Sequence, residues 1–290
     1  MNRLISELNS MLNANRMILG YGNLKTKRNC VNLHYYHSEI VSDNYYKNNL
    51  GDYLSKIVVE WMCKRGGVSL SNEIKGMKHL YAIGSIILMG YQNATIWGTG
   101  FPFKPSFLRG FPHKSPIRKL DVRCVRGPQT KKILEKLGHK CAEVYGDPAV
   151  LMPLIYTPEK SEKALDFVVI PHFSTEEYMK NKVSKDQIVS MNTDDYKKVI
   201  DRICSAKKVI SSSLHGIILA ESYGVPAVFL NTWQERFKFK FEDWYLSTNR
   251  HPDYSVKSIE DAIQAEIVMP QNIKELQNNL INSFPYDLWK

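Results

Sequence analysis

One segment of the chain joins serine and histidine side chains to the predicted start of a helix. Residues 209–226, with the sequence VISSSLHGIILAESYGVP, predict an apolar strand, a serine loop and then a helix. Unpaired backbone amides at a helix start attract anions, serine hydroxyls can add donors, and His215 can donate a hydrogen bond or a proton. The alternative is an ordinary serine N-cap with a locally packed histidine. We favour an anion site, because similar signals recur elsewhere; its predicted ligands are Ser211, Ser212, Ser213, Leu214, His215 and Gly216.

A second candidate ligand is an arginine at the carboxyl end of another predicted strand. Residues 121–128 have the sequence DVRCVRGP, in which Arg126 comes just before a predicted helix. There its guanidinium can hold a phosphate or a carboxylate through paired donors. We interpret Arg123, by contrast, as a structural partner of Asp121. The segment therefore predicts that Arg126 binds an anionic ligand and that Arg123 stabilises the fold.

Two further side chains have the chemistry for proton transfer. His172 follows the predicted strand Asp166–Ile170, whose end faces the predicted cleft, and a structural role and a catalytic role are equally open. Asp52 ends the sequence NNLGD, where a helix cap is favoured and a general base is the alternative. In the same loop Gly51 lets the backbone approach a ligand, and Asn49 is a further cleft candidate.

A glycine turn follows a predicted strand over residues 94–97. It consists of Gly98, Thr99 and Gly100, which we include as cleft candidates. The turn is too short to specify a nucleotide, and neither a GxGxxG motif nor a phosphate-loop lysine accompanies it. The sequence YGDP at residues 145–148 is interpreted as a tight turn that closes the first half of the chain.

The elements that must position these residues alternate along the chain. Short apolar runs separated by longer amphipathic stretches indicate βα units and mainly parallel sheets. The expected strands are Cys30–Tyr36, Leu80–Ile83, Ala94–Trp97, Asp121–Val125, Ala142–Tyr145, Asp166–Ile170, Lys208–Ser211 and Val225–Leu230. The expected helices are Leu50–Met62, Gln129–Leu137, Thr193–Ser205, His215–Tyr223, Ser258–Ile267 and Ile273–Ser283.

These elements predict two α/β domains of Rossmann-like type. The polar, proline-bearing stretch Pro153–Lys163 is typical of an interdomain linker. We therefore expect an N-terminal domain over residues 1–155, which contributes Arg126, and a C-terminal domain over residues 156–290, which contributes the SSSLHG loop and ends in helices. Ligands of such sheets bind beyond the carboxyl ends of the strands, so the central cleft between the facing domains is the expected site.

Composition and charge narrow the class of partner. The chain has 290 residues, of which 43% are hydrophobic and 23% charged, as in an ordinary core-forming protein. Lys and Arg total 39 against 29 Asp and Glu, a formal charge of +10 that suits an anionic partner. Because the sequence has no arginine-rich arm, zinc finger or aromatic RNA-binding signature, we expect no nucleic-acid partner; an acidic membrane face or a phosphorylated small molecule remains.

Other features bear on metals and on localisation. The five cysteines form no CxxC pair, and the histidines show no metal-ligand spacing, so we expect no metal, no cofactor and no disulfide framework. No run of 18 apolar residues predicts a membrane-spanning helix. Residues 1–20 carry scattered charges without a compact apolar core, so we expect no secretory signal there and a cytoplasmic protein.

Six motifs, taken in their order and spacing, resemble the polysaccharide pyruvyl transferase family. They lie within residues 33–233 and read NNLGD, WGTG, VRCVRGP, EVYGDPAVLMP, VIPHF and ISSSLHGIILAESYGVPAVFL. The resemblance implies a two-domain GT-B-like glycosyltransferase architecture. It also implies that the enolpyruvyl unit of phosphoenolpyruvate is moved onto two hydroxyls of one sugar, which forms a cyclic pyruvate ketal.

The resemblance further implies which residues meet the donor. Arg126 and His215 would contact phosphoenolpyruvate, with the serine loop of residues 211–213 beside them. Some members have an arginine where this chain has Ser213, so either a cation from the segment Phe103–Lys119 replaces it or donor binding is weaker. His79 and His113 are the candidates for a catalytic histidine in the first domain.

The chemistry of the reaction suits the same residues. The methylene carbon must gain a proton and a hydroxyl must lose one, which suits His215 as donor ligand and acid, His172 as a second proton-transfer group and Asp52 as base. The implied acceptor is a hexose in a polysaccharide or in a lipid-linked precursor such as an undecaprenyl-linked glycan. The segments Lys104–Lys119 and Trp233–Trp244 would then touch an anionic membrane surface.

Two alternatives remain open at this stage. A nucleotide-sugar-dependent glycosyltransferase of GT-B fold would need a carboxylate for ribose, for which Glu221 is the candidate in the second half. A non-catalytic module that binds an anionic glycan would need the positive charge but no proton-transfer groups. It predicts that replacing His215 or Arg126 leaves every activity unchanged.

Overall fold

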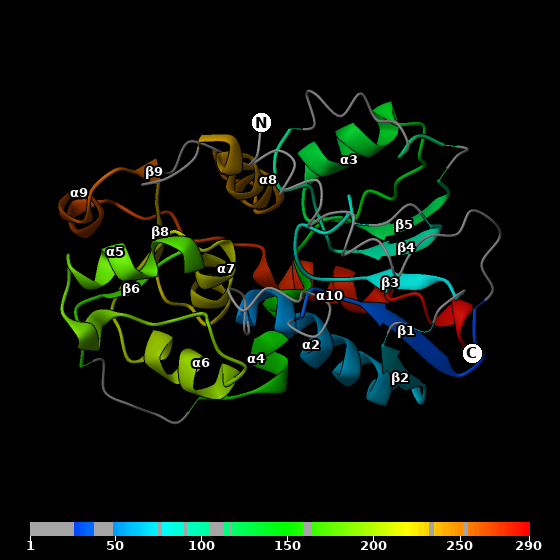
Figure 1. Ribbon diagram of the computed structural model, residues 1–290, viewed down its shortest axis with the longest axis horizontal. Coiled ribbons are helices and arrows are strands. Elements are labelled where there is room, and N and C mark those ends of the chain that lie inside the picture. The colour runs from blue at the N-terminus through cyan, green and yellow to red at the C-terminus, as the bar shows by residue number, and fades with distance from the viewer. Residues whose placement is uncertain are drawn as a thin grey trace.

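Two parallel β-sheets lie side by side in the molecule (Figure 1). The computed structural model describes residues 26–37, 49–72, 74, 77–89, 92–104, 113–115, 118–158, 164–231, 235–251 and 255–290. The expectation about residues 1–20 therefore lies outside the described residues, as do Asn48, Trp233 and most of Phe103–Lys119. The mixed α/β class with parallel sheets that the sequence predicts is confirmed.

The first sheet has the strand order β2-β1-β3-β4-β5, and every neighbouring pair is parallel. Its strands are β1 (Cys30–His34), β2 (Ser69–Asn72), β3 (His79–Tyr81), β4 (Ala94–Trp97) and β5 (Leu120–Cys124). The order of the strands along the chain reverses between β1 and β3. In a doubly wound sheet such a reversal opens a crevice beyond the carboxyl ends of the two strands, where ligands bind.

The second sheet has the order β6-β7-β8-β9 and is also parallel throughout. Its strands are β6 (Val168–Ile170), β7 (Val209–Ser211), β8 (Ala227–Leu230) and β9 (Ser255–Val256). The first three are buried at every position, as expected for strands that are covered on both faces.

Helices cover both sheets and connect the strands. They are α2 (Leu50–Gly66), α3 (Pro128–Lys136), α4 (Met152–Ile155), α5 (Glu176–Lys180), α6 (Tyr196–Cys204), α7 (Leu214–Ser222), α8 (Lys238–Ser247), α9 (Ile259–Gln264) and α10 (Ile273–Ser283). The short 3-10 helices are Pro148–Leu151, Phe173–Thr175, Lys185–Gln187, Glu235–Phe237 and Tyr286–Leu288. Helix α2 packs on β1 and β2, and α7 packs on β7 and β8. One buried apolar cluster contains Leu54 of α2, Ile170 of β6 and Ile217 of α7, so the two halves share a core.

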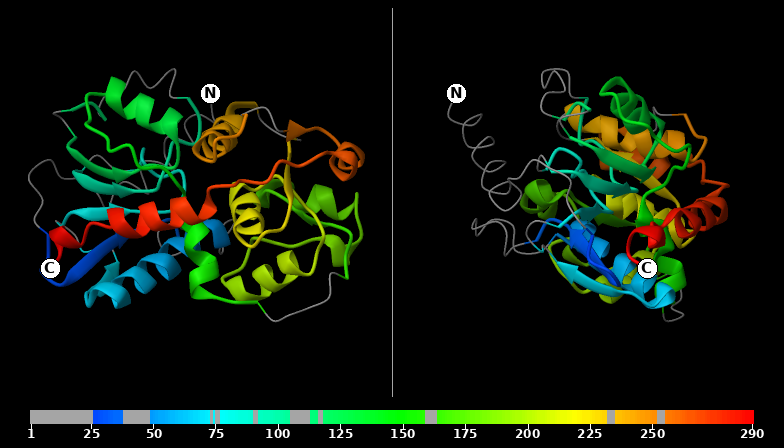
Figure 2. Two further views of the ribbon diagram at one scale, coloured as in Figure 1. Left: turned by 180° about the vertical axis from the view of Figure 1, so that it is seen from behind. Right: turned by 90° about the vertical axis from the view of Figure 1, so that its right-hand side faces the viewer.

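Two late helices return to the first half of the chain. Helix α8 packs against α3, and α10 packs against β5 and the 3-10 helix Pro148–Leu151. The indole Nε1 of Trp97 in β4 donates to the carbonyl of Leu280 in α10 at 3.0 Å. Seen from behind, α10 crosses the side of the first sheet (Figure 2). Residues from the second half of the chain thus help to build the surroundings of the first sheet.

The structure corrects several predicted elements. The expected strand Ala142–Tyr145 is reduced to isolated bridges, Val122 to Cys141 and Val125 to Tyr145. Strands β2 and β9 and helix α8 were not predicted from the sequence. Strand β2 is polar and short, with the sequence SLSN, and β9 has two residues, so neither carries the apolar run by which a strand is recognised.

Arg123 has the structural role that the sequence predicts. Its Nε lies 2.7 Å from Oδ1 of Asp121, and its two terminal nitrogens bond both carboxylate oxygens of Asp287 at 2.9 and 2.8 Å. The second pairing joins β5 to the C-terminal turn. Arg123 is therefore used by the fold, as expected.

The described helices and the described aromatic residues bear on membrane contact. Within the residues that the structure covers, no helix combines the length and apolarity needed to cross a bilayer. In the segment Trp233–Trp244, the side chains of Phe239, Phe241 and Trp244 are buried inside the protein. These three aromatic rings are therefore core residues, and membrane contact would have to use other groups.

Candidate active site

A pocket of about 300 Å³ that contains titratable side chains lies where the carboxyl ends of strands from both sheets converge. Tyr36 follows β1, the loop Ser85–Met89 follows β3, His172 follows β6, and the loop before α7 follows β7. The lining residues are Tyr36, Asn49, Asp52, Ser85, Ile86, Met89, His172, Met191, Ser213, Leu214, His215 and Lys240. The pocket thus occupies the position beyond the strand ends where parallel α/β sheets bind ligands.

The start of α2 forms one wall of this pocket. Asn49 is the N-cap: its Oδ1 accepts from the amide of Gly51 at 3.2 Å, and its Nδ2 donates to Oδ2 of Asp52 at 2.8 Å. The interpretation of Asp52 as the cap is therefore wrong, because Asn49 has that role. The carboxylate of Asp52 instead lines the pocket.

Asp52 lies in surroundings that act on its charge in opposite directions. Burial raises the pKa of the Asp52 carboxyl above its ordinary value, while His215, Lys240 and the hydrogen bond from Asn49 act in the opposite direction. Gly84 adopts a positive φ of 107°, and a Cβ there would lie 2.9 Å from Oδ1 of Asp52. A glycine is therefore needed beside this carboxylate.

The start of α7 forms the opposite wall. The Ser211 hydroxyl oxygen lies 2.9 and 2.8 Å from the carbonyls of Ile170 and Ser213 and has one proton to donate between them, and the Ser212 hydroxyl donates to the carbonyl of Leu230 at 2.9 Å. Both are buried and hold the loop in place, whereas Ser213 lines the pocket. No side chain caps the start of α7 within the described residues. The first amides of this helix are thus available to an anion.

His215 connects the two walls. Its Nε2 lies 3.6 Å from Oδ2 of Asp147, whose side chain is fully buried. A Cβ on Gly51 would overlap Nδ1 of His215, so the start of α2 can approach the imidazole only because residue 51 is glycine. Gly216 serves α7 in the same way, since a Cβ there would lie 2.5 Å from the Ser211 hydroxyl.

Two further titratable groups line the pocket. His172 is half-buried, and its Nδ1 lies 2.8 Å from the hydroxyl of Ser174. Burial, together with the charge of Lys240, lowers the pKa of His172 to about 3, so this imidazole is neutral at physiological pH. Burial and the nearby Arg126 lower the pKa of Lys240 to about 8, against the opposing effect of Asp52. Lys240 is still mostly cationic at pH 7.

Arg126 lies immediately behind the pocket. Its side chain is fully buried, its Nη1 donates to the Ser85 hydroxyl at 2.9 Å, and its Nη2 donates to the carbonyl of Phe101 at 2.6 Å. Its Nε is 3.5 Å from Oδ2 of Asp243 in α8. Ser85, which lines the pocket, separates the guanidinium from the cavity. The predicted donor contact of Arg126 stays a prediction.

The glycine turn at residues 98–100 supports this region from behind. The Thr99 hydroxyl donates to the carbonyl of Gly84 at 2.6 Å, and the carbonyl of Thr99 accepts from the amide of Arg126 at 3.2 Å. A Cβ on Gly100 would lie 2.5 Å from the Arg126 guanidinium, and one on Gly98 would overlap Pro148. The structure thus places Gly98, Thr99 and Gly100 behind the loop that lines the pocket.

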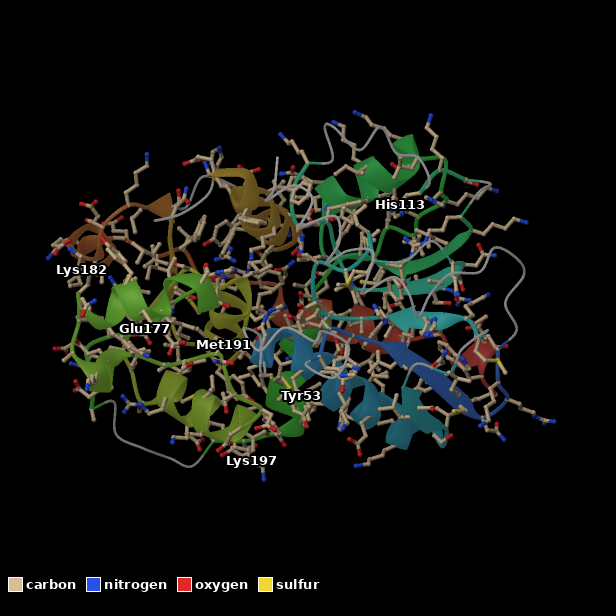
Figure 3. The ribbon with its side chains drawn as sticks, in the orientation of Figure 1. Tyr53, His113, Glu177, Lys182, Met191 and Lys197 are labelled. Carbon is tan, nitrogen blue, oxygen red and sulfur yellow. The ribbon has the colours of Figure 1, made fainter. Side chains whose placement is uncertain are left out.

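The candidate histidines of the first half lie elsewhere. His113 is buried, 3.1 Å from Nη1 of Arg118, and lies beside α3, well apart from Met191 of the pocket (Figure 3). His79 is buried in β3 with its ring edge against His34. Neither lines the pocket within the described residues.

Most of the segment Phe103–Lys119, from which a replacement cation is expected, lies outside the described residues, so that expectation stays a prediction. Among the cations of that segment that the structure describes, Arg118 is buried and donates to the carbonyls of Ile87 and Gln92. Among the described residues that line the pocket, Lys240 is the lysine, and it was not predicted from the sequence. It lies between the buried residues Phe239 and Phe241 in α8, a helix that was not predicted from the sequence.

Two more residues of the site were not recognised as such. Asp147 was interpreted as part of a turn, and its Oδ1 does cap the 3-10 helix by accepting from Ala149 at 3.0 Å. The apolar sequence after it, PAVLM, signals that this carboxylate is buried, but its partner is 68 positions away along the chain. Ser85 carries no sequence signal beyond its place after a strand.

The contacts of Glu221 and the grouping of possible metal ligands bear on two other chemistries, the binding of a nucleotide sugar and the binding of a metal ion. The carboxylate of Glu221 is buried and bonds both terminal nitrogens of Arg250, at 2.6 and 2.8 Å, and Nε1 of Trp244 at 2.8 Å. It is therefore not available to hold a ribose. Across the described part of the chain, no three His, Cys, Asp or Glu side chains group in a way that could hold a metal ion.

Comparison with known proteins shows which family has a similar sequence. The sequence profile of the family described as polysaccharide pyruvyl transferase matches residues 34–234, which include every lining residue except Lys240. "Uncharacterized protein L143" of Acanthamoeba polyphaga mimivirus is 27% identical over 215 residues, 71% of this chain and 69% of that protein. "Succinoglycan biosynthesis protein ExoV" of Rhizobium meliloti (strain 1021) is 27% identical over 150 residues, 51% of this chain and 45% of that protein.

Proposed function

The chain belongs to the polysaccharide pyruvyl transferase family and is a transferase, and on this premise we propose that its pocket binds phosphoenolpyruvate and transfers the pyruvyl unit to a sugar as a cyclic ketal. The observation that carries the proposal is the meeting of Asp52, His172, His215 and Lys240 in one pocket at the starts of α2 and α7. This set supplies cations and amides for an anion together with groups that move protons.

The donor is proposed to bind at the start of α7. Phosphoenolpyruvate carries a carboxylate and a phosphate, and the uncapped amides of α7, the Ser213 hydroxyl and the Lys240 ammonium can each bond one of them. Ser211, Ser212 and Gly216 shape this loop from behind. Arg126 adds positive charge one residue behind the wall, and it would touch the donor directly if Ser85 moved aside.

Proton transfer is assigned to three side chains. His215 gives a proton to the methylene carbon of phosphoenolpyruvate, which leaves a carbocation-like centre at the adjacent carbon. A hydroxyl of the sugar attacks this centre and gives its proton to Asp52, whose raised pKa suits a base. Inorganic phosphate then leaves and the second hydroxyl attacks; His172, which lines the same pocket, is assigned as the second proton-transfer group.

The steps balance without another reactant. Two C–O bonds form to the sugar, one C–H bond forms at the methylene carbon, and the C–O bond to phosphate breaks. Of the two protons lost by the hydroxyls, one replaces the proton spent on carbon and the other leaves with hydrogen phosphate. No change of oxidation state between reactants and products requires a redox cofactor, and no step above is assigned to a metal.

The acceptor and the architecture extend the same proposal. We assign the acceptor to the first half of the chain, residues 1–155, and the donor to residues 156–290, as two Rossmann-like domains of a GT-B-like architecture, with the pocket between them. The name of the relative from Rhizobium meliloti supports a polysaccharide, such as an exopolysaccharide or capsule, or its undecaprenyl-linked precursor, as acceptor. The formal charge of +10 supports a cytoplasmic protein that works at an anionic membrane surface.

The reaction is tested by incubating the protein with phosphoenolpyruvate and a panel of lipid-linked and aryl glycosides. The expected result is phosphate release matched by an acceptor that gains the mass of pyruvate less one water. Replacing His215 or Asp52 abolishes both signals if the assignment is right. A protein that binds sugar nucleotides but not phosphoenolpyruvate in calorimetry would instead be a glycosyltransferase, and the proposal would fall.

A further inference from the structure

We propose that Asp147 is a positioning residue that fixes the proton of His215 on Nε2 and leaves Nδ1 as the atom that exchanges protons with the substrate. The proposal rests on the proposed function for its catalytic meaning. Its structural content does not, because it concerns which nitrogen of His215 carries a proton in the protein alone. Residues 147 and 215 lie in different halves of the chain and meet behind the pocket.

The geometry separates the two nitrogens of the imidazole. Nε2 of His215 and Oδ2 of Asp147 lie 3.6 Å apart, both are inaccessible to solvent, and neither has a hydrogen-bond partner among the described residues. The other edge of the ring, with Nδ1, faces the start of α2, where the absence of a side chain at Gly51 leaves room for it. One nitrogen is thus directed at a buried carboxylate and the other toward the pocket wall that carries Asp52.

Asp147 is itself held rigidly for this task. Its Oδ1 accepts from the amide of Ala149 at 3.0 Å, which fixes the carboxylate plane and directs Oδ2 at His215. A buried carboxylate oxygen without a hydrogen-bond partner is costly, so the distance between Oδ2 and Nε2 is expected to shorten to a hydrogen bond when the pocket is occupied. The two oxygens therefore have separate roles, one in capping the 3-10 helix and one in orienting the imidazole.

The other charged groups around His215 do not replace Asp147. Asp52 lies across the ring on α2, and Lys240 of α8 and His172 line the pocket. Asp52 is already bonded to Asn49 and faces the side on which the substrate is proposed to bind. Among the described carboxylates, only Asp147 has an oxygen within ion-pairing distance of a ring nitrogen of His215, at 3.6 Å.

The consequence concerns the tautomer of the neutral ring. When Nε2 carries a proton that Asp147 accepts as a hydrogen bond, Nδ1 has the lone pair or the transferable proton. After His215 has given its Nδ1 proton to carbon, the remaining Nε2–H form is the one that Asp147 stabilises. An asparagine at position 147 reverses this: its oxygen can still cap Ala149, and its NH₂ group then faces Nε2 and favours the Nδ1–H form.

The test is nitrogen NMR of the imidazole in protein labelled with ¹⁵N-histidine. Long-range ¹H–¹⁵N correlations distinguish the two tautomers, and His215→Gln assigns the signal by its disappearance. We expect the Nε2–H form for neutral His215 in the wild type and the Nδ1–H form in Asp147→Asn. A wild-type Nδ1–H form, or an unchanged tautomer in Asp147→Asn, would overturn the proposal. Neither readout depends on phosphoenolpyruvate.

Kinetics then connect the pair to catalysis. Asp147→Asn is expected to lower kcat about 10²-fold or more, with little change in KM and in thermal midpoint, because the cap is retained and only the tautomer is wrong. Asp147→Ser, which keeps a capping oxygen but reaches no imidazole, serves as the second variant if the asparagine protein does not fold. Wild-type kcat in a folded Asp147→Asn or Asp147→Ser protein refutes the positioning role. An inactive wild type refutes the proposed function alone.

Discussion

Two helices of this molecule, α3 and α7, start soon after a strand, and their N-termini are used in opposite ways. Helix α3 follows a strand, an arginine and a glycine, and α7 follows a strand and a serine loop. At α3, Asp243 of α8 accepts from the amides of Gln129 and Thr130 at 2.9 and 3.1 Å and from the Thr130 hydroxyl at 2.6 Å. At α7 no side chain of the described residues caps the helix, and its first turn lines the pocket.

The difference teaches which helix start is free to bind a ligand. The positive end of α3 is neutralised by a carboxylate of the protein itself, and the arginine beside it is enclosed. Gly127 permits this contact, because a Cβ there would overlap the backbone of Asp243. The positive end of α7 keeps its amides for a substrate. One helix start therefore stabilises the fold by anchoring α8, and the other is available for binding.

The largest effect should come from the open helix start. His215→Gln removes the proposed acid and is expected to lower kcat/KM by about 10³- to 10⁴-fold, or about 4–5.5 kcal/mol of transition-state stabilisation, with a thermal midpoint close to that of the wild type. Phosphate release from phosphoenolpyruvate measures kcat/KM, and calorimetric melting measures the thermal midpoint. His251→Gln is the matched control, because His251 is exposed and does not line the pocket. A His215→Gln protein within tenfold of the wild type would contradict the assignment.

The occupied helix start should respond in the opposite way. Asp243→Ala leaves Arg126 buried beside an empty cap and is expected to reduce the free energy of unfolding by about 3 kcal/mol. Urea denaturation measures this loss. The double variant Arg126→Met with Asp243→Leu should lose less than the sum of the single changes, because it leaves no unpaired buried charge. Full additivity, or a stable Asp243→Ala protein, would show that the pair does not anchor α8.

Much of the pocket could be predicted from local sequence. Parallel strands place their carboxyl ends at one edge of a sheet, so the residues that follow apolar runs, His172 and His215, were expected at a common site, and the structure places both in its lining. Asp52 was identified for the same reason, although the cap was assigned to the wrong residue of its loop. These predictions needed only periodicity and the residue that follows each strand.

The rest depends on contacts that no local pattern reveals. Lys240 lies between two phenylalanines that are buried in the structure. In the sequence, a lysine in this position is as typical of the solvent-exposed face of a helix as of a pocket wall. Asp243 meets Arg126 across 117 positions of the chain, so nothing near Arg126 in the sequence shows that its anion is internal. A strand followed by arginine and a helix is the same signal whether the helix binds a ligand or a carboxylate of its own chain.

A smaller effect is expected for the cation that accompanies the open helix start. Lys240→Met should raise KM for phosphoenolpyruvate about 30-fold, or about 2 kcal/mol, because it removes a charged donor from the pocket. Lys238→Met is the control, since Lys238 lies two residues earlier beside Glu242 and does not line the pocket. An unchanged KM in Lys240→Met would exclude this lysine from donor binding.

Titration of Lys240 should make KM for phosphoenolpyruvate depend on pH. Because the pKa of Lys240 is lowered to about 8, the ammonium loses its proton as the pH rises through that value, and KM of the wild type should rise above pH 8. The donor stays fully ionised over this range, so it does not contribute to the change. Lys240→Arg keeps its charge and should show a flat KM up to about pH 10. A rise of KM in both proteins would place the titrating group elsewhere.

The smallest effects should separate two adjacent serines of the open helix start. Ser212 donates from a buried position to Leu230, so Ser212→Ala is expected to reduce the free energy of unfolding by about 1 kcal/mol and to leave KM unchanged. Ser213 lines the pocket and caps nothing, so Ser213→Ala should raise KM about threefold at unchanged stability. Denaturation and donor titration measure the free energy of unfolding and KM for each of the two variants. If Ser213→Ala lost stability and Ser212→Ala lost affinity, the serine hydroxyls would have the reverse roles, and the donor would have to bind on the other side of the loop.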